Sequence, residues 1–284
     1  MDTPRQFVEL LYDDYGQLFE IDEVLFERRT DHQHLVIFRH GKFGRVMALD
    51  GVIQTTEKDE FIYHEMLTHV PLLGHGSARR VLIIGGGDGG MLREVTRHAD
   101  VQSITQVEID PQVVEMCRTY LPGHSRGAFD DPRLELVFAD GAAFMRESDA
   151  RFDVIIIDST DPIGPGKVLF SESFYRDCAA RLADGGIIVT QNGVAWMQLD
   201  EAISTGRAFA RLFPDWHFFS AAVPTYVGGI MLFGWGATDR QRDTLDLATL
   251  RERYDRAGLR TRYYTPELHH ASFALPAYVM DALQ

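Results

Sequence analysis

The sequence predicts an α/β protein in which a small N-terminal β domain precedes a larger domain built on a parallel sheet. Residues 81–110 follow the pattern strand, glycine-rich loop, helix, strand, which is one right-handed βαβ unit, and strand and helix patterns alternate after it. Residues 1–56 instead carry short apolar stretches separated by turn signals, which is typical of a β-meander. We therefore place the domain boundary after residue 56, and the second domain covers residues 57–284.

Composition and charge favour a cytoplasmic enzyme. The 284 residues are 45% hydrophobic, which is enough for a core, and two cysteines provide neither a disulfide framework nor a thiolate zinc cluster. No apolar run approaches the ~20 residues of a membrane span, and the first residues lack the layout of a signal peptide. The net charge of −14 disfavours nucleic acid and anionic membranes as partners and allows a cationic substrate.

A helix is expected directly after the β-meander. It begins near Thr56, carries an apolar stripe, and is expected to stop at Pro71. Tyr63 and His64 lie near its start, where a lone Tyr or His is usually a packing residue. His64 and His69 are five residues apart, so they do not share a helix face, and we expect no metal site there.

The glycine-rich loop GGGDGG, residues 85–90, is the strongest single signal. It matches G-x-G-x-x-G, and Glu108 follows about twenty residues later, where an acid usually binds a ribose hydroxyl pair. Asp88 lies inside the loop and would repel a pyrophosphate at the helix N-terminus, which disfavours NAD. A cationic adenosyl sulfonium such as S-adenosylmethionine, or a relative of it, fits better. The alternative is that Asp88 only caps the helix.

The next two strands also end in acids. Asp140 follows the predicted strand 134–138, and Asp158 and Asp161 follow the predicted strand 152–157. The carboxyl ends of parallel strands form the rim where open α/β sheets bind ligands. Asp140 before Gly141 is equally consistent with a turn, but two acids in a Pro- and Gly-rich loop are hard to explain by turn chemistry alone. The loop 159–167 is expected to close over a substrate.

The remaining chain completes the sheet. Helices are expected at 171–186, ended by glycine, and at 200–213, with a strand between them. The stretches HFFSAAVPTY and IMLFGWG resemble an antiparallel pair at the sheet edge, and Tyr226 lies at their turn.

Six motifs in order resemble spermidine synthase, of the aminopropyltransferase family, in its bacterial type. They are LDGVIQTTEKDEFIYHEM, GGGDGG, VEID, ADG, DSTDPIGPG and PTYVGG, and the resemblance covers almost the whole chain. It implies a Rossmann-like sheet of the methyltransferase type behind the small β domain, and a homodimer or homotetramer. It also implies transfer of the aminopropyl group of decarboxylated S-adenosylmethionine to putrescine, with the sulfonium bound as a co-substrate and no permanent cofactor.

The resemblance also implies roles for single residues. The nucleoside site corresponds to Gln33, Gln54, Glu108, Asp140, Gly141 and Pro165. The polyamine and aminopropyl contacts correspond to Tyr63, His64, Asp88, Asp161 and Tyr226, and Asp158, assisted by Tyr63, corresponds to the catalytic proton acceptor. Ala139 departs from the family pattern, which often has a second acid before Asp140, and His64 is an amide side chain in some relatives.

Two other functions are compared with this one. A methyltransferase would share the fold and the type of co-substrate, but a methyl group carries no distal ammonium and leaves Asp88 without a partner. A non-catalytic polyamine-binding protein would keep the acids that hold cations but would not need Asp158 together with Tyr63.

Overall fold

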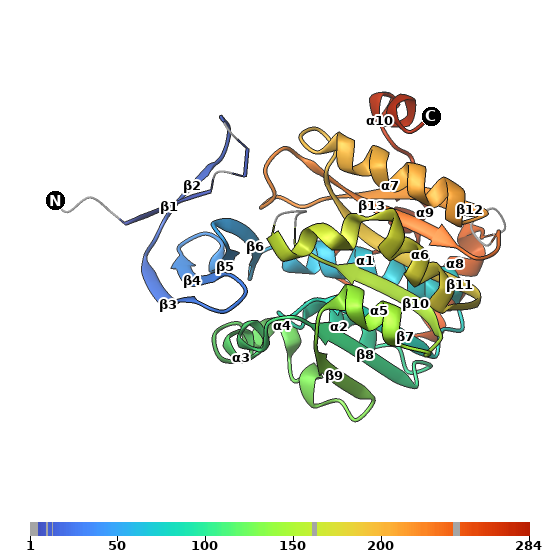
Figure 1. The fold of residues 1–284 in the computed structure, drawn as a ribbon, viewed down its shortest axis with the longest axis horizontal. Helices are drawn as coiled ribbons and strands as arrows, with labels where there is room; N and C mark the ends of the chain where they lie inside the picture. Colours follow the sequence, from blue (N-terminus) through green and yellow to red (C-terminus); the bar gives the residue numbers. More distant parts are fainter. Residues whose placement is uncertain (1–4, 10, 13, 161–163, 241–244) are drawn as a thin grey trace.

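The computed structural model describes residues 5–9, 11–12, 14–160, 164–240 and 245–284, without the side chains of residues 164 and 165. Two sheets and a small hairpin organise these residues, with the hairpin and the smaller sheet at one end of the molecule (Figure 1). The N-terminal strands are β1 Gln6–Glu9, β2 Gln17–Glu20, β3 Glu23–Arg29, β4 His34–His40, β5 Gly44–Leu49 and β6 Val52–Thr56. As the β-meander pattern predicted, β3 to β6 pair antiparallel in chain order.

The larger sheet has seven strands in the order β12-β13-β11-β10-β7-β8-β9. Neighbouring pairs from β11 to β9 are parallel, while β13 pairs antiparallel with β11 and with β12. This is the predicted parallel sheet with an antiparallel edge. Its strands are β7 Arg80–Gly85, β8 Ser103–Glu108, β9 Leu134–Phe138, β10 Phe152–Asp158, β11 Leu182–Val194, β12 Asp215–Ala222 and β13 Ile230–Ala237.

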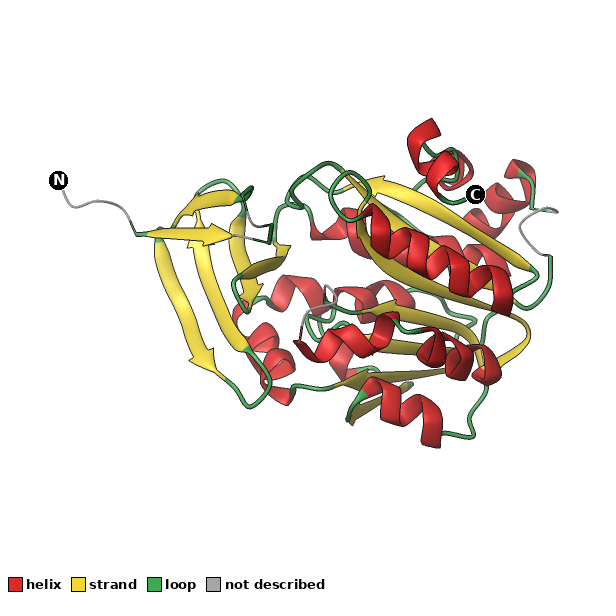
Figure 2. Ribbon diagram, turned by 45° about the horizontal axis from the view of Figure 1, so that its top comes forward, coloured by secondary structure: helices red, strands yellow, loops and turns green. Residues whose placement is uncertain are grey.

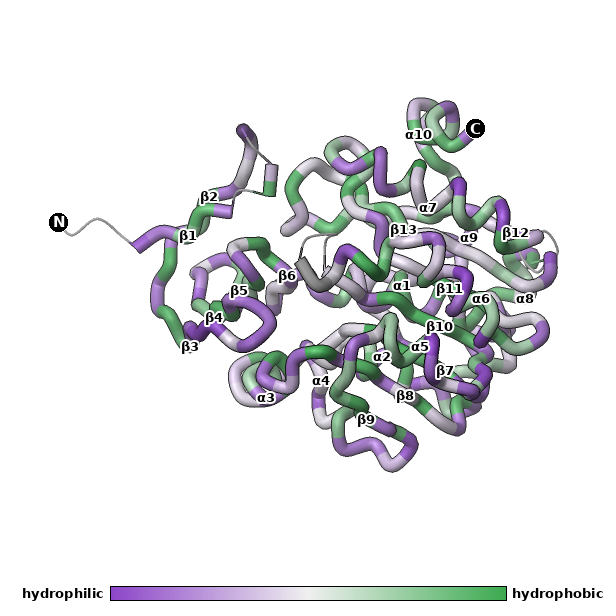
Figure 3. The backbone as a smooth tube through the Cα atoms, in the orientation of Figure 1, coloured by the Kyte–Doolittle hydropathy of each residue, from purple (hydrophilic) through white to green (hydrophobic). Residues whose placement is uncertain are grey.

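Helices cover both faces of the larger sheet (Figure 2). In β10, Val154 and Ile156 face one apolar cluster, whereas Ile155 and Ile157 face the other, as expected for a strand buried on both sides. Helices α1, α2 and α8 contribute to the first cluster, and α5, α6 and α7 to the second. The hydropathy colouring shows this strand as an apolar run (Figure 3).

The helical segments run as follows: α1 Glu60–His75, α2 Gly90–Thr96, α3 Pro111–Tyr120, α4 Pro122–Ser125, η1 Ala128–Asp130, α5 Gly141–Glu147, η2 Gly164–Phe170, α6 Glu172–Arg181, α7 Leu199–Leu212, α8 Leu247–Arg256, α9 Pro266–Ser272 and α10 Ala277–Ala282. None of the helices in the described part of the chain has the length and apolar character needed to cross a membrane.

Helix α3 joins the small sheet to the larger domain. Val113 and Cys117 of α3 pack with Leu35 and Met47 of the small sheet in one buried cluster. The Arg45 guanidinium also donates to the carbonyl of Tyr120 at 2.6 Å. The small sheet is therefore held against the rim of the larger sheet, which positions its residues over the carboxyl ends of the parallel strands.

Two predicted helix ends are wrong. Helix α1 continues through Pro71 to His75, where Gly76 adopts the left-handed conformation and donates to Leu72. Leu72 and Leu73 are buried in the core, and this packing favours helix beyond the proline. Helix α6 ends at Arg181 rather than at a glycine, because β11 already begins at Leu182.

Candidate active site

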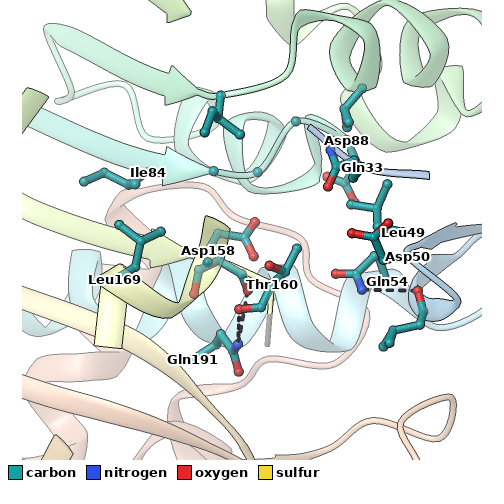
Figure 4. A pocket seen from close by; sticks show the side chains of 18 of the residues that line it. Gln33, Leu49, Asp50, Gln54, Ile84, Asp88, Asp158, Thr160, Leu169 and Gln191 are labelled. Atoms are coloured by element: carbon teal, nitrogen blue, oxygen red, sulfur yellow. Dashed lines mark hydrogen bonds between the residues drawn. The ribbon is translucent and has the colours of Figure 1, made fainter. Parts of the chain in front are cut away.

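A cavity of about 220 Å³ lies between the rim of the larger sheet and the small sheet. Its walls come from the ends of β7, β8 and β10 on one side and from β5 and β6 on the other. In Figure 4, Asp158 faces this space from β10, while Asp50 and Gln54 approach it from the small sheet. The cavity therefore needs both parts of the chain.

Glycines let the loop after β7 approach its neighbours closely. Gly85 has a φ of 85°, and a Cβ placed there would lie 2.0 Å from the carbonyl oxygen of Asp158. A Cβ on Gly90 would lie 2.2 Å from Cε1 of His64. The loop thus brings Asp88 close to both Asp158 and His64, and larger residues at Gly85 and Gly90 would separate these elements.

Tyr63 and Asp158 form a hydrogen-bonded pair in the cavity. The Tyr63 hydroxyl donates to Oδ1 of Asp158 at 2.7 Å. Burial, with the nearby charge of Asp88, raises the pKa of Asp158 to about 6, although His64 and the Tyr63 hydrogen bond oppose the rise. Burial and Asp158 also raise the pKa of Tyr63, so Tyr63 stays a donor. Asp158 is therefore a carboxylate with a strengthened affinity for a proton.

Asp88 has the opposite character. Its Oδ1 accepts from the backbone N–H of Gly90 at 2.7 Å, and its Oδ2 lies 3.3 Å from Nε2 of His64. Burial alone would raise the pKa of Asp88, but the charge and hydrogen bond of His64 outweigh burial and hold that pKa well below its usual range. Two nearby carboxylates thus differ: Asp88 stays ionised, whereas Asp158 takes up a proton near pH 6.

The predicted nucleoside residues line another part of the cavity. The Gln33 amide donates to Asp110 at 3.1 Å, and Glu108 accepts from the Asp110 N–H at 3.0 Å. Burial raises the pKa of Glu108 to about 7 despite two hydrogen bonds from backbone N–H groups. Asp140 is the N-cap of α5 and accepts from the Ala143 N–H at 2.7 Å, and it also lines the cavity.

Tyr226 and Gln54 connect the two sides of the cavity. The Tyr226 hydroxyl donates to the carbonyl oxygen of Gln54 at 2.8 Å, and its ring meets that of Tyr63 edge-on at 6.0 Å. The Gln54 amide donates to the Val52 carbonyl at 3.2 Å.

Most of the predicted site residues line this one cavity, namely Gln33, Gln54, Tyr63, His64, Asp88, Glu108, Asp140, Gly141, Asp158 and Tyr226. Asp161 lies outside the described residues, and Pro165 lies in η2 with its side chain outside the description. The predicted closing loop, residues 159–167, is therefore described only in part. Within the described residues, no group of three or more His, Cys, Asp or Glu side chains is arranged to hold a metal ion.

Sequence reasoning missed several polar residues of the cavity, among them Glu9 and Gln191. Glu9 is 4% exposed, and its carboxylate accepts from the Ile53 N–H at 2.7 Å and from Gln17 at 2.8 Å. Gln191 is 3% exposed and donates to the carbonyl oxygens of Ser159 and Thr160 at 3.1 and 3.2 Å. Figure 4 shows Gln191 beside Thr160. The signal available for Gln191 was its place at the end of a buried strand, next to the predicted rim.

Comparisons with known sequences identify the family of this chain. The family described as spermine/spermidine synthase domain matches residues 60–246, and the spermidine synthase tetramerisation domain matches residues 7–57. Polyamine aminopropyltransferase 1 of Pseudomonas aeruginosa is 62% identical over 277 residues, which cover 98% of this chain and 97% of that protein. The polyamine aminopropyltransferase of Pectobacterium atrosepticum is 58% identical over 284 residues, covering 100% of this chain and 99% of that one.

Two solved structures share the fold of this chain. A spermidine synthase in complex with the transition-state analogue AdoDATO superimposes with a TM-score of 0.93 at 38% identity, covering 99% of this chain and 96% of that one. Spermidine synthase from Thermotoga maritima gives a TM-score of 0.89 at 36% identity, covering 99% and 95%. This confirms the predicted Rossmann-like fold with its small N-terminal β domain. With the acid-lined cavity, both domain matches and these relatives in agreement, the chain belongs to the spermine/spermidine synthase family of transferases.

Proposed function

We propose that this chain transfers the aminopropyl group of decarboxylated S-adenosylmethionine to putrescine, giving spermidine and 5'-methylthioadenosine. The observation that carries the proposal is the pairing of a proton-accepting carboxylate, Asp158 with Tyr63, with a permanently ionised carboxylate, Asp88, in one cavity. The first suits removal of a proton from an amine. The second suits binding of a cation.

The nucleophile must be an uncharged amine. If its pKa resembles that of Lys, freeing its lone pair near pH 7 costs about 4 to 5 kcal/mol. In the proposed step, the amine lone pair attacks the carbon next to the sulfonium, the carbon–sulfur bond breaks, and its electron pair goes to sulfur. Asp158 takes the proton from the amine nitrogen, and Tyr63 holds the carboxylate in line.

The other acids bind the two reactants. We assign Asp88 to the amine of the aminopropyl group and Asp161 to the far ammonium of putrescine. Glu108 binds the ribose hydroxyls, and the region of Asp140 and Gly141 binds the adenine. Glu9 and Gln191 line the same cavity and are candidates for further contacts with the amine.

The experiment is product analysis by mass. The protein is incubated with decarboxylated S-adenosylmethionine and a panel of di- and triamines, and in parallel with S-adenosylmethionine. We expect spermidine and 5'-methylthioadenosine from the decarboxylated donor with putrescine. Methylated amines from S-adenosylmethionine, without aminopropyl products, would contradict the proposal.

We also propose a homotetramer. The match of residues 7–57 to a tetramerisation domain supports it, as does the apolar surface of the β1–β2 hairpin, where Val8 and Leu18 are 51% and 56% exposed. Light scattering after size exclusion tests this assembly. A mass near 32.1 kDa, that of one chain, would contradict it.

A further inference from the structure

A row of buried charges extends from the cavity into the core behind Asp88. It runs from Asp88 through His64 and Glu60 to Arg93, with side-chain exposures of 8%, 4%, 5% and 8% in that order. The residues come from three separate segments, the glycine-rich loop, α1 and α2. Their signs alternate, so each buried charge has an opposite charge beside it.

The geometry sets the protonation state of His64. Its Nδ1 lies 2.6 Å from Oε2 of Glu60, and its Nε2 lies 3.3 Å from Oδ2 of Asp88. The Nδ1 contact is a hydrogen bond and the Nε2 contact is an ion pair, so an ionised carboxylate faces each ring nitrogen and favours a proton on both. His64 is therefore an imidazolium between two carboxylates.

Arg93 holds Glu60 in place. Its Nη1 and Nη2 donate to the two oxygens of Glu60 at 3.1 and 2.9 Å, which is a bidentate pair. Its Nε donates to Glu94 at 2.7 Å, and Nη1 also donates to the carbonyl of His124 at 2.6 Å. Because the guanidinium is fixed by these additional partners, the Glu60 carboxylate has one available orientation, and that orientation faces His64.

The other groups near His64 do not take the place of Glu60 and Asp88 as its charged partners. Tyr63 lies edge-on at 5.5 Å, and the ring of His124 lies at 6.3 Å. His124 forms a hydrogen bond with Thr55 at 2.9 Å instead. Burial lowers the pKa of His124, which favours its neutral form near pH 7. Among the described residues, Asp158 is a further charged group that interacts with His64, and it is hydrogen-bonded to Tyr63.

We propose that Glu60 and Arg93 are positioning residues, which keep His64 as an imidazolium so that His64 fixes the Asp88 carboxylate in the orientation that binds the donor's ammonium group. The proposal rests on the proposed function, in which Asp88 binds the aminopropyl amine. Burial opposes the charged ring, but Asp88 and Glu60 outweigh burial and raise the pKa of His64 to about 10, which agrees with the geometry.

The test follows the charge of one ring by NMR, without turnover. His64 is identified by the signal that disappears in His64→Gln, and its Cε1 proton is followed from pH 6 to 8.5. We expect no titration in the wild type and a titration within this range in Glu60→Gln. A wild-type ring that titrates near 6.5, its ordinary value, overturns the proposal even if Glu60→Gln does not fold. Because this readout needs no substrate, it is independent of whether the chain transfers aminopropyl groups.

Kinetics then test whether Glu60 acts through His64. We expect Glu60→Gln to raise KM for the donor about tenfold, with a much smaller change in kcat, as for loss of a charged binding partner. Glu147→Gln is the matched control, because Glu147 is exposed on α5, away from the cavity. In the His64→Gln background, Glu60→Gln is expected to have no further effect on the donor KM. An equal effect in both backgrounds would show a general structural role and overturn the proposal.

Discussion

The Tyr63 hydroxyl and the Asp158 carboxylate, from α1 and β10, lie 2.7 Å apart in the cavity. The hydrogen bond joins two segments that are 95 residues apart in the sequence. It orients the carboxylate, and it stabilises the ionised form that accepts a proton. The predictions below follow from this pair and from the residues that surround it.

Replacing Tyr63 by Phe removes this hydrogen bond and leaves the ring. Because the bond favours ionised Asp158, its loss raises the pKa of Asp158 further, and the acid limb of the pH–rate profile moves to higher pH. We expect kcat to fall about 10- to 100-fold at pH 7. Steady-state kinetics of Tyr63→Phe check this, with the exposed Tyr278→Phe as the control. A wild-type profile in Tyr63→Phe would be incompatible with the assigned role.

The wild-type enzyme has a predicted pH dependence. Burial raises the pKa of Asp158 to about 6, so the base is ionised above this pH and protonated below it. The value of kcat/KM is therefore expected to fall tenfold per pH unit below about 6. A rate profile from pH 5 to 9 measures this limb. Asp158 would not be the base if activity stayed constant down to pH 5.

The Gly90 position is predicted to accept no side chain. A Cβ there would lie 2.2 Å from the His64 ring, so Gly90→Ala displaces His64 from Asp88. We expect donor binding to weaken about tenfold or more, together with a loss of stability of about 1 to 3 kcal/mol. Calorimetry and thermal unfolding measure the two effects. Gly123→Ala is the matched control, because nothing lies within 4 Å of a Cβ at Gly123.

Gln191 is predicted to hold in place the backbone of Ser159 and Thr160, which directly follow Asp158. Its amide nitrogen donates to the carbonyls of Ser159 and Thr160, so Gln191→Glu places a carboxylate oxygen against two carbonyl oxygens. We expect kcat/KM for the amine to fall about 10- to 100-fold, because the carbonyl oxygens of Ser159 and Thr160 both lose their hydrogen-bond donor. Gln191→Met, which lacks the repulsion, is expected to lose less. Wild-type kcat/KM in Gln191→Met, which also lacks the amide donor, would contradict the role of the donor.

Local patterns allowed much of the fold to be predicted. Strand β9 was predicted with its observed bounds, Leu134–Phe138, because its apolar residues run directly into the turn signal Asp140-Gly141. The end of α1 was not predicted, because tertiary packing of the residues after Pro71 decides it. Local sequence patterns describe caps and turns, but they do not show which distant surface an apolar residue meets.

The residues of the site also fall into those that local sequence patterns indicate and those that depend on distant contacts. Glycines and acids at strand ends indicated Asp88, Asp140 and Asp158 without reference to distant contacts. Glu9 was missed because its burial depends on contacts with Gln17 and Ile53 that only the folded N-terminal region makes. The pairing of His64 with Glu60 follows helical spacing, four residues apart, and that signal was present in the sequence.

The account depends on Asp158 as the group that takes the proton from the amine. The most direct test is turnover of Asp158→Asn with decarboxylated S-adenosylmethionine and putrescine, with donor binding measured by calorimetry on the same sample. We predict that the donor Kd changes less than about fivefold while kcat falls at least about 100-fold. Turnover at the wild-type rate in this variant would contradict the central claim.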